Sequence, residues 1–359
     1  MDGSLDEALE RLDGTGFEFG PAGLSNHGPM AAEALVRLGR GEEAPRWVDR
    51  YRCRLGPAPD PTDPVDDGTW RAGLGDIRRV ADWQAYLRRQ MDDGPWADVV
   101  ARWVPRLLPG IMAAATHGVI RTAHAVRALD ESETALRLDE LAAGLAYWAA
   151  RYQEVPGTPR LRGTKSVAQA AAAIPAASGF TGGLISDAVR AVGDFDGFGD
   201  AVDGMAAPVS VDDALSDLTA TCARVYLADA GAAPIAFIHA VTGPAALRLL
   251  LPHLPPAIHA TAFAYAWQTG AALLSAYGGT APVTMGEAQG PEGEPMLTDP
   301  PGADKEGSVR GGGPEDLIER AVANGDEHAI KFTEACLREN DIRPDPAYLA
   351  AALDSTSRL

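Results

Sequence analysis

The chain has 359 residues, of which 46% are hydrophobic, and it carries a formal net charge of −19. This length and hydrophobic content predict a globular fold with a sizeable core. The acidic charge argues against a nucleic-acid partner, because a phosphate backbone requires a basic face on the protein.

The cysteines and the N-terminus indicate the compartment. Cys53, Cys222 and Cys336 are far apart and form no CxxC pair, so we expect neither a disulfide framework nor a cysteine-type zinc site. This usage fits a reducing cytoplasm, and the acidic N-terminus lacks the basic and apolar segments of a signal peptide. The uncharged run over residues 257–277 is long enough to span a membrane, but its polar residues and many alanines favour a buried core helix. We therefore expect a cytoplasmic protein with no membrane partner.

The first half of the chain shows the apolar periodicity of successive helices. The clearest is residues 111–129, in which His117 and His124 are seven positions apart and therefore share one helix face. A loop becomes a helix near Pro29, which suits a first helical turn that Ser25 or Asn26 could cap. The helices predicted in this half cover residues 4–12, 31–39, 47–55, 77–91, 96–108, 111–129 and 133–152.

The second half continues the helical pattern in an alanine-rich background. The Gly- and Asp-rich residues 193–203 predict a loop. The apolar run 234–244 between two prolines fits a strand or a buried helix, and we favour the helix. Residues 278–313 are rich in Gly, Pro and acidic residues, which predicts a lid or a disordered loop. The remaining predicted helices cover residues 166–173, 184–192, 211–229, 245–251, 256–277, 314–324 and 347–353.

Strand signals are nearly absent, and no alternation of strands with helices and no internal repeat can be traced. We therefore predict an all-α protein, a single large multi-helix domain over residues 1–359 with a metal site in its helical core. No HExxH, GxSxG or GxxxxGKS/T motif is present, and the Gly-rich segments follow no strand. A nicotinamide or flavin site is therefore not expected.

A helix is also predicted to begin at residues 326–337, after the turn signal Asn324-Gly325. His328 and Lys331 are three positions apart in apolar surroundings, so they share one helix face. Lys331 is one of only three lysines in the chain, and a buried lysine, unlike an arginine, can lose its proton and become a nucleophilic amine. A solvated surface helix is the alternative interpretation of these residues.

The seven histidines offer a candidate metal site. His253 is expected to end a loop, and His259 to be a hydrogen-bonded core residue. Each of the others fits a structural role when taken singly, but four of them lie beside small residues at helix starts or at Pro- and Gly-rich positions. Imidazoles brought from four helices into one bundle core form a site that suits iron, copper, zinc or nickel. These four residues, which we call the histidine cluster, are His27, His117, His239 and His328.

Four segments that contain these histidines resemble the questin oxidase-like family. The resemblance extends from about residue 17 to about residue 340. Members include fungal enzymes that oxidatively open anthraquinone rings in polyketide biosynthesis. The resemblance implies an all-α fold and a mononuclear non-haem iron held by four histidines and a carboxylated lysine. The segments are SNHGPMAAEAL at residues 25–35, THGVIRTAH at 116–124, FIHAVT at 237–242 and DEHAIK at 326–331.

The resemblance also assigns roles to residues of this chain. The histidine cluster would supply nitrogen ligands to Fe(II), and a carboxylated Lys331 would supply an oxygen ligand. Burial favours the neutral amine of a lysine, and a neutral amine can add CO2 to give a carbamate that the metal then stabilises. No catalytic residue is implied beyond these ligands. Residues expected to support the ligands are Asn26, His124, Thr242 and Glu327, and His124 is alternatively a competing ligand.

Three functions compete on this sequence. The leading one is a non-haem iron oxygenase that cleaves a ring of an anthraquinone-like polyketide, with a dioxygenase or Baeyer–Villiger-like outcome. The second is a zinc-dependent hydrolase with a carbamylated lysine, which the lack of alternating strands disfavours. The third is a non-enzymatic helical ligand-binding protein. The partners expected for the leading function are a small aromatic molecule and O2, while an external reductant and the oligomeric state stay open.

Overall fold

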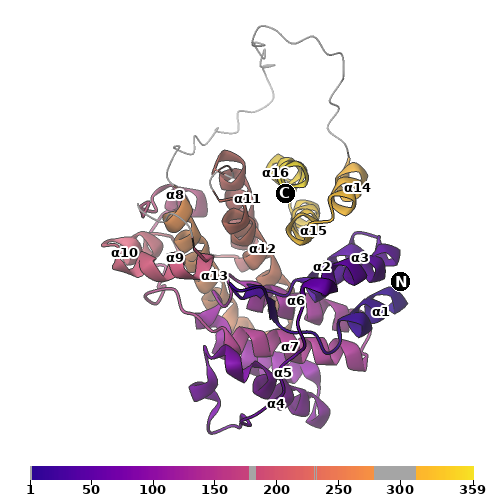
Figure 1. Cartoon of the computed structure of the whole chain (residues 1–359). Helices are drawn as coiled ribbons and strands as arrows, with labels where there is room; N and C mark the ends of the chain where they lie inside the picture. Colours follow the sequence, from indigo (N-terminus) through magenta and orange to yellow (C-terminus); the bar gives the residue numbers. More distant parts are fainter. Residues whose placement is uncertain (1, 178–182, 230, 232, 279–312) are drawn as a thin grey trace, which may run out of the picture.

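A computed structural model describes residues 2–177, 183–229, 231, 233–278 and 313–359 (Figure 1). The described part contains sixteen α-helices and one short hairpin, which confirms the all-α prediction. The hairpin pairs β1 (Glu18–Phe19) with β2 (Leu24–Ser25). The helices are α1 (Asp2–Leu12), α2 (Gly28–Arg37), α3 (Ala44–Tyr51), α4 (Val80–Asp93), α5 (Trp96–Leu107), α6 (His117–Glu131), α7 (Ala135–Ala150), α8 (Val167–Ala172), α9 (Ile185–Ala191), α10 (Phe198–Asp203), α11 (Val211–Asp229), α12 (Pro234–Leu250), α13 (Pro256–Tyr277), α14 (Pro314–Asn324), α15 (Glu327–Ile342) and α16 (Pro346–Arg358).

Four helices that are distant in the sequence form a closed ring in space. Helix α2 packs on α6, α6 on α12, α12 on α15, and α15 back on α2 (Figure 1). Helices α4 and α7 extend the core beyond α6, and α16 covers α15 from outside. Each of these four helices carries one residue of the histidine cluster. In α2, α6 and α15 this residue stands at the start of the helix, and in α12 it lies within the helix. The fold therefore brings the four imidazoles toward the middle of one helical ring.

Helix α12 shows how packing overrides local sequence. The predicted segments 234–244 and 245–251 are one continuous helix that runs through Pro244. A proline inside a helix costs about 3 kcal/mol, which the near-complete burial of α12 offsets. The span Pro234–His253 is long and apolar enough to cross a membrane, but 78% of its most apolar window is buried inside the protein, as in a core helix.

The prediction of a loop over residues 193–203 is wrong. A 3-10 turn at Val192–Asp194 is followed by helix α10, which packs against α13. Phe198 and Val202 are four positions apart and both buried, and the Trp267 indole donates a hydrogen bond to the Val202 carbonyl at 3.0 Å. These contacts hold a helix that the Gly- and Asp-rich composition disfavours. The predicted lid or disordered loop at residues 278–313 lies outside the described residues, apart from its first and last positions.

Helices α6 and α7 approach each other closely at Gly118. A Cβ atom at this position would lie 2.7 Å from the Trp148 Cα and 2.8 Å from its Cβ, atoms that cannot swing aside. We expect Gly118→Ala to lower the free energy of unfolding by about 1–3 kcal/mol, measured by urea denaturation, because an overpacked core must shift its backbone. The matched control is Gly199→Ala in α10, where the added methyl meets nothing within 4 Å. Equal stabilities for the two variants would contradict the close approach.

Candidate metal centre

The histidine cluster comes from four separate helices. His27 is the N-cap of α2, His117 is the first residue of α6, His239 lies in α12, and His328 is the second residue of α15. Three of the four therefore stand at helix starts, where a chain turning from loop to helix projects a side chain inward. The prediction of a helix from residue 111 is wrong at its beginning, and this places His117 at a helix start rather than within one.

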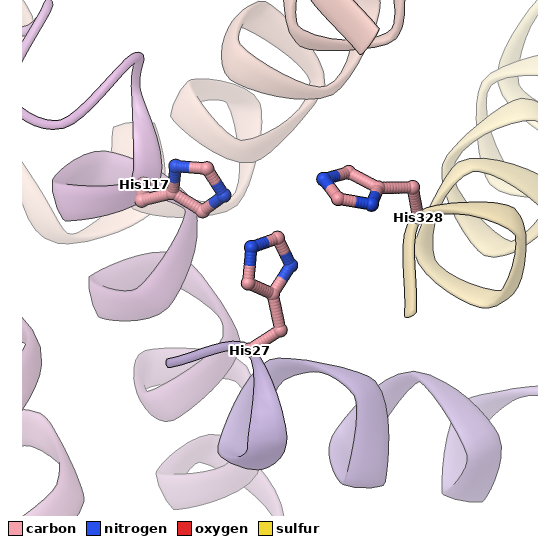
Figure 2. Close-up of side chains that lie close together, drawn as sticks. All are labelled: His27, His117 and His328. Carbon is pink, nitrogen blue, oxygen red and sulfur yellow. The ribbon is translucent and has the colours of Figure 1, made fainter. Parts of the chain in front are cut away.

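The imidazole rings of the histidine cluster lie close together. The ring centroids of His27 and His117 are 4.4 Å apart, and those of His27 and His328 are 4.5 Å apart. His239 lies 4.4 Å from His117 by the same measure. Figure 2 shows His27, His117 and His328 pointing toward a common centre from three different helices. One nitrogen from each of these three lies within 4.8 Å of the others, which is close enough for the three to hold a single metal ion.

An unusual backbone segment delivers His117. Ala114, Ala115 and Thr116 have φ values of 49°, 56° and 71°, in the left-handed region that residues other than glycine rarely adopt. Such strain persists where surrounding structure enforces it, and it is found at functional sites. This backbone conformation places a carbonyl of the segment beside the histidine cluster. The His117 Nδ1 donates to the Ala114 carbonyl at 2.5 Å. The Thr116 hydroxyl lies 3.3 Å from the His239 Nδ1.

These two contacts leave the opposite ring nitrogens without partners. Among the described residues, the Nε2 atoms of His117 and His239 are buried and have no hydrogen bond. Buried nitrogen atoms are normally paired, since leaving one unpaired costs the desolvation of that atom. A histidine that holds a metal through one nitrogen typically donates its other N–H to a protein oxygen. The arrangement of His117 with Ala114 and of His239 with Thr116 therefore fits metal ligands.

Lys331 belongs to the same centre. Its side chain is 4% exposed, and its Nζ lies 2.8 Å from the Nδ1 of His27. The alternative interpretation of Lys331 as a solvated surface lysine is wrong. Burial lowers the pKa of Lys331 to about 8, although Glu327 and Asp326 act in the opposite direction. At pH 7 an amine with this pKa is still mostly protonated, but roughly one in ten molecules carries it neutral, far more than for an ordinary lysine.

Burial also sets the charge state of the imidazoles. It lowers the pKa of all four members of the histidine cluster, and neighbouring cationic groups lower the pKa of His27 further. Burial alone would raise the pKa of Asp326, but hydrogen bonds from His328 and Ala329 hold it at about 2, so this carboxylate stays ionised beside His328. The cluster is neutral at neutral pH, which is the form of histidine that binds metals.

The residues predicted to support the ligands act in different ways. Asn26 donates to the Gly16 carbonyl at 2.8 Å and accepts from the Gly28 N–H at 2.9 Å, so it fixes the backbone on both sides of His27. Glu327 pairs with Arg54 at 3.1 Å and lines the same cavity as His27 and His328. Thr242 donates to a backbone carbonyl within α12 and lines a small cavity that Lys331 and His239 also line.

His124 pairs with a carboxylate and not with the histidine cluster, although it lines a small cavity together with His239 and Lys331. Its Nδ1 donates to the Glu33 carboxylate at 2.6 Å, inside a group of buried ion pairs. Ala114, Thr116 and Asp326 contact the imidazoles, and none of these contacts was predicted from the sequence. Asp326 could have been found from its position as a helix cap, but nothing in the sequence signals the left-handed backbone at Ala114 and Thr116.

A cavity of about 600 Å³ opens over the cluster. All four members of the histidine cluster line it, and three of them, His27, His117 and His328, are drawn in Figure 2. Its wall is apolar at Phe19, Leu24, Ile185 and Ile235, and its polar lining includes Glu18 and Ser25 of the hairpin together with Arg151 and Arg190. A volume of this size holds a small organic molecule, and a few placed polar groups in an apolar wall are typical of such sites.

One family model matches the chain. It is described as Questin oxidase-like and covers residues 26–336, a span that includes the histidine cluster and Lys331. Comparison with curated proteins gives no match.

Proposed function

Because the chain belongs to the questin oxidase-like family, we propose that it is a non-haem iron oxygenase that opens a ring of an anthraquinone-like polyketide. The family indicates an oxidoreductase that acts on polyketides. We propose in addition that the reaction requires iron and that it cleaves a ring.

One observation carries the proposal of a metal. Two buried imidazole nitrogens, the Nε2 atoms of His117 and His239, have no partner among the described residues, and they stand in a cluster with two further imidazoles. We infer that the histidine cluster holds Fe(II), together with a carboxylated Lys331 that adds an oxygen ligand. Iron bound in this way would supply the binding and activation of O2. Nitrogen-rich ligation of this kind suits iron more than magnesium or calcium.

The chain's own residues provide the remaining conditions. The neutral amine of Lys331 can attack CO2, forming an N–C bond while the amine loses a proton, and the product is a carbamate with a carboxylate-like end. Ala114, Thr116 and Asp326 orient the rings of His117, His239 and His328 through their second nitrogens. The apolar wall of the cavity accommodates the faces of a flat aromatic substrate next to these ligands.

Metal analysis tests the proposal. We expect protein purified with added ferrous iron to contain stoichiometric iron and to consume O2 when hydroxyanthraquinones are added. Stoichiometric zinc and no O2 uptake would instead support the hydrolase with a carbamylated lysine. Protein that binds anthraquinones but takes up no metal under any condition would support a helical ligand-binding protein.

A further inference from the structure

A hydrogen-bond chain that links Ser25, Tyr147, Glu18 and Arg151 connects the cavity wall to the protein core. The Ser25 hydroxyl lies 2.8 Å from the Tyr147 hydroxyl, and the Tyr147 hydroxyl donates to the Glu18 carboxylate at 2.9 Å. Glu18 and Ser25 are directly opposed in the β1–β2 hairpin, so their side chains leave the same face of it. Ser25 and Glu18 line the cavity over the histidine cluster, while the Tyr147 residue is only 1% exposed.

Arg151 is the last member of this hydrogen-bond chain, and it donates to both oxygens of Glu18. Arg151 donates from its Nε to the Glu18 Oε1 at 2.6 Å and from its Nη2 to the Oε2 at 2.5 Å. This two-point pair is the strong form of a carboxylate–guanidinium contact, and in it both oxygens of Glu18 act as acceptors. An ionised carboxylate can only accept hydrogen bonds. Gly23 leaves room for this pair, because a Cβ there would lie 3.0 Å from the Glu18 Oε2.

The number of protons that each hydroxyl carries then determines the direction of every hydrogen bond in this hydrogen-bond chain. A tyrosine hydroxyl has one proton, and Tyr147 gives it to Glu18, so Ser25 must donate its own proton to the Tyr147 oxygen. Ser25 therefore has no proton left for a ligand, and its oxygen can only accept. The Tyr147 hydroxyl is Ser25's only side-chain partner among the described residues.

We propose that Ser25 is a specificity-determining residue that accepts a hydrogen bond from a phenolic hydroxyl of the bound aromatic molecule. This inference rests on the proposed function for the class of substrate. The inference adds that this hydroxyl must be unmethylated, because a methyl ether in its place would present a second acceptor to the Ser25 oxygen. A site built to bond a hydroxyl discriminates against analogues without it, because its own polar group is then left unpaired.

Binding to the metal-free protein tests this without turnover. The probes are anthraflavic acid, a dihydroxyanthraquinone whose hydroxyls lie away from the quinone carbonyls, and its dimethyl ether. We expect the wild-type chain to bind the hydroxyl form about tenfold more tightly, which corresponds to one net hydrogen bond. Ser25→Ala should bring the ratio of the two dissociation constants close to unity. Equal binding of the two probes by the wild type would overturn the inference, as would failure to bind either.

A second variant separates hydrogen bonding from fit. Tyr147→Phe keeps the ring but removes the acceptor of the Ser25 proton, so Ser25 becomes free to donate to an ether oxygen. We expect this variant to bind the dimethyl ether more tightly than the wild type does, and thus to narrow the ratio. A ratio unchanged by Tyr147→Phe would mean that the Ser25 side chain merely fills space, and it would overturn the proposal.

The matched control is Tyr152→Phe. Tyr152 also lines the cavity, but its hydroxyl donates to Glu154 at 2.7 Å and is no part of the chain from Ser25, so its ratio should equal that of the wild type. No metal takes part in these measurements, which separates the two proposals. Hydroxyl-selective binding in a protein that never takes up iron would support the role of Ser25 and contradict the iron oxygenase. Unselective binding in an iron-dependent oxygenase would do the reverse.

Discussion

Replacing Lys331 with alanine is expected to reduce iron binding by more than the roughly 10–100-fold that loss of a supporting residue costs a metal site. The reason is that Lys331, once carboxylated, is the only oxygen ligand proposed among four imidazoles. O2 uptake with hydroxyanthraquinones should fall with the iron content. Elemental analysis of protein purified with added ferrous iron measures the first effect, and an oxygen electrode measures the second.

Two variants serve as references for Lys331→Ala. Lys165→Ala makes the same change at a lysine that does not line the cavity over the histidine cluster, and it should leave iron content at the wild-type level. Lys331→Glu supplies a carboxylate that needs no CO2, and it should recover part of the iron that the alanine variant loses. Wild-type iron content in Lys331→Ala, with a wild-type melting temperature for the metal-free protein, would refute a role for this residue as ligand.

The helices could be predicted from sequence where an apolar stripe agrees with the final packing. The bounds of α11, α13 and α14 match their predicted ranges, because capping and breaking residues mark both ends. The hairpin of Glu18 and Ser25 could not be predicted, since each strand has only two residues and gives no alternation. Helix α10 was missed for the opposite reason, because its stability comes from burial against α13 rather than from its own composition.

The candidate site divides in the same way. His27 and His328 could be recognised as residues at helix starts, because turn and capping residues precede them. The direction in which Ser25 bonds, by contrast, depends on Arg151 and Tyr147, which are more than a hundred positions away in the chain. A single sequence shows local periodicity and capping, but it does not show which distant side chains meet. The positions of the proposed ligands were thus accessible from the sequence, whereas of the groups that contact them only Asp326 was.

The four helices that carry the histidine cluster are also joined by buried ion pairs. Arg127 of α6 donates to Glu33 of α2 at 2.8 Å and also contacts Glu334 of α15. Arg37 adds a second bond to Glu33, and Arg338 a second to Glu334, at 2.8 and 3.0 Å. The series continues through Glu339 to Arg248, which lies on α12. Charges of opposite sign alternate along this network, which we infer holds the ring of helices at a fixed spacing around the site.

Arg127 is the member whose loss should cost most. Its side chain is 11% exposed, and those of Glu33 and Glu334 are 3% and 5% exposed. Arg127→Met keeps most of the side-chain length but leaves two buried carboxylates short of their shared cation. Removing one partner of a buried ion pair destabilises a protein by about 3–5 kcal/mol. We expect a loss of this size in the free energy of unfolding, measured by urea denaturation at neutral pH.

The pH dependence of the loss identifies its cause. In the wild type, burial would raise the pKa of Glu334, but Arg127 and Arg338 hold it at about 2, so its contribution is present above the unfolded value of roughly 4.3 and lost as the pH falls toward 2. Without Arg127 we expect burial to raise the pKa of both carboxyls above the unfolded value, so the folded variant should bind protons more readily than the unfolded one. Its deficit relative to the wild type should therefore shrink as the pH is lowered from about 7 to about 5.

Two further variants complete the test of the network. Arg46→Met removes an exposed arginine of α3 and should change stability by no more than about 0.5 kcal/mol. Adding Glu334→Gln to Arg127→Met removes one of the unpaired charges and should restore part of the lost stability. A deficit in Arg127→Met that is independent of pH and unaffected by Glu334→Gln would show that Arg127 acts through packing alone. Because Glu33 and His27 share α2, and Glu334 and Lys331 share α15, a network that acts through charge should also lower iron content when it is broken.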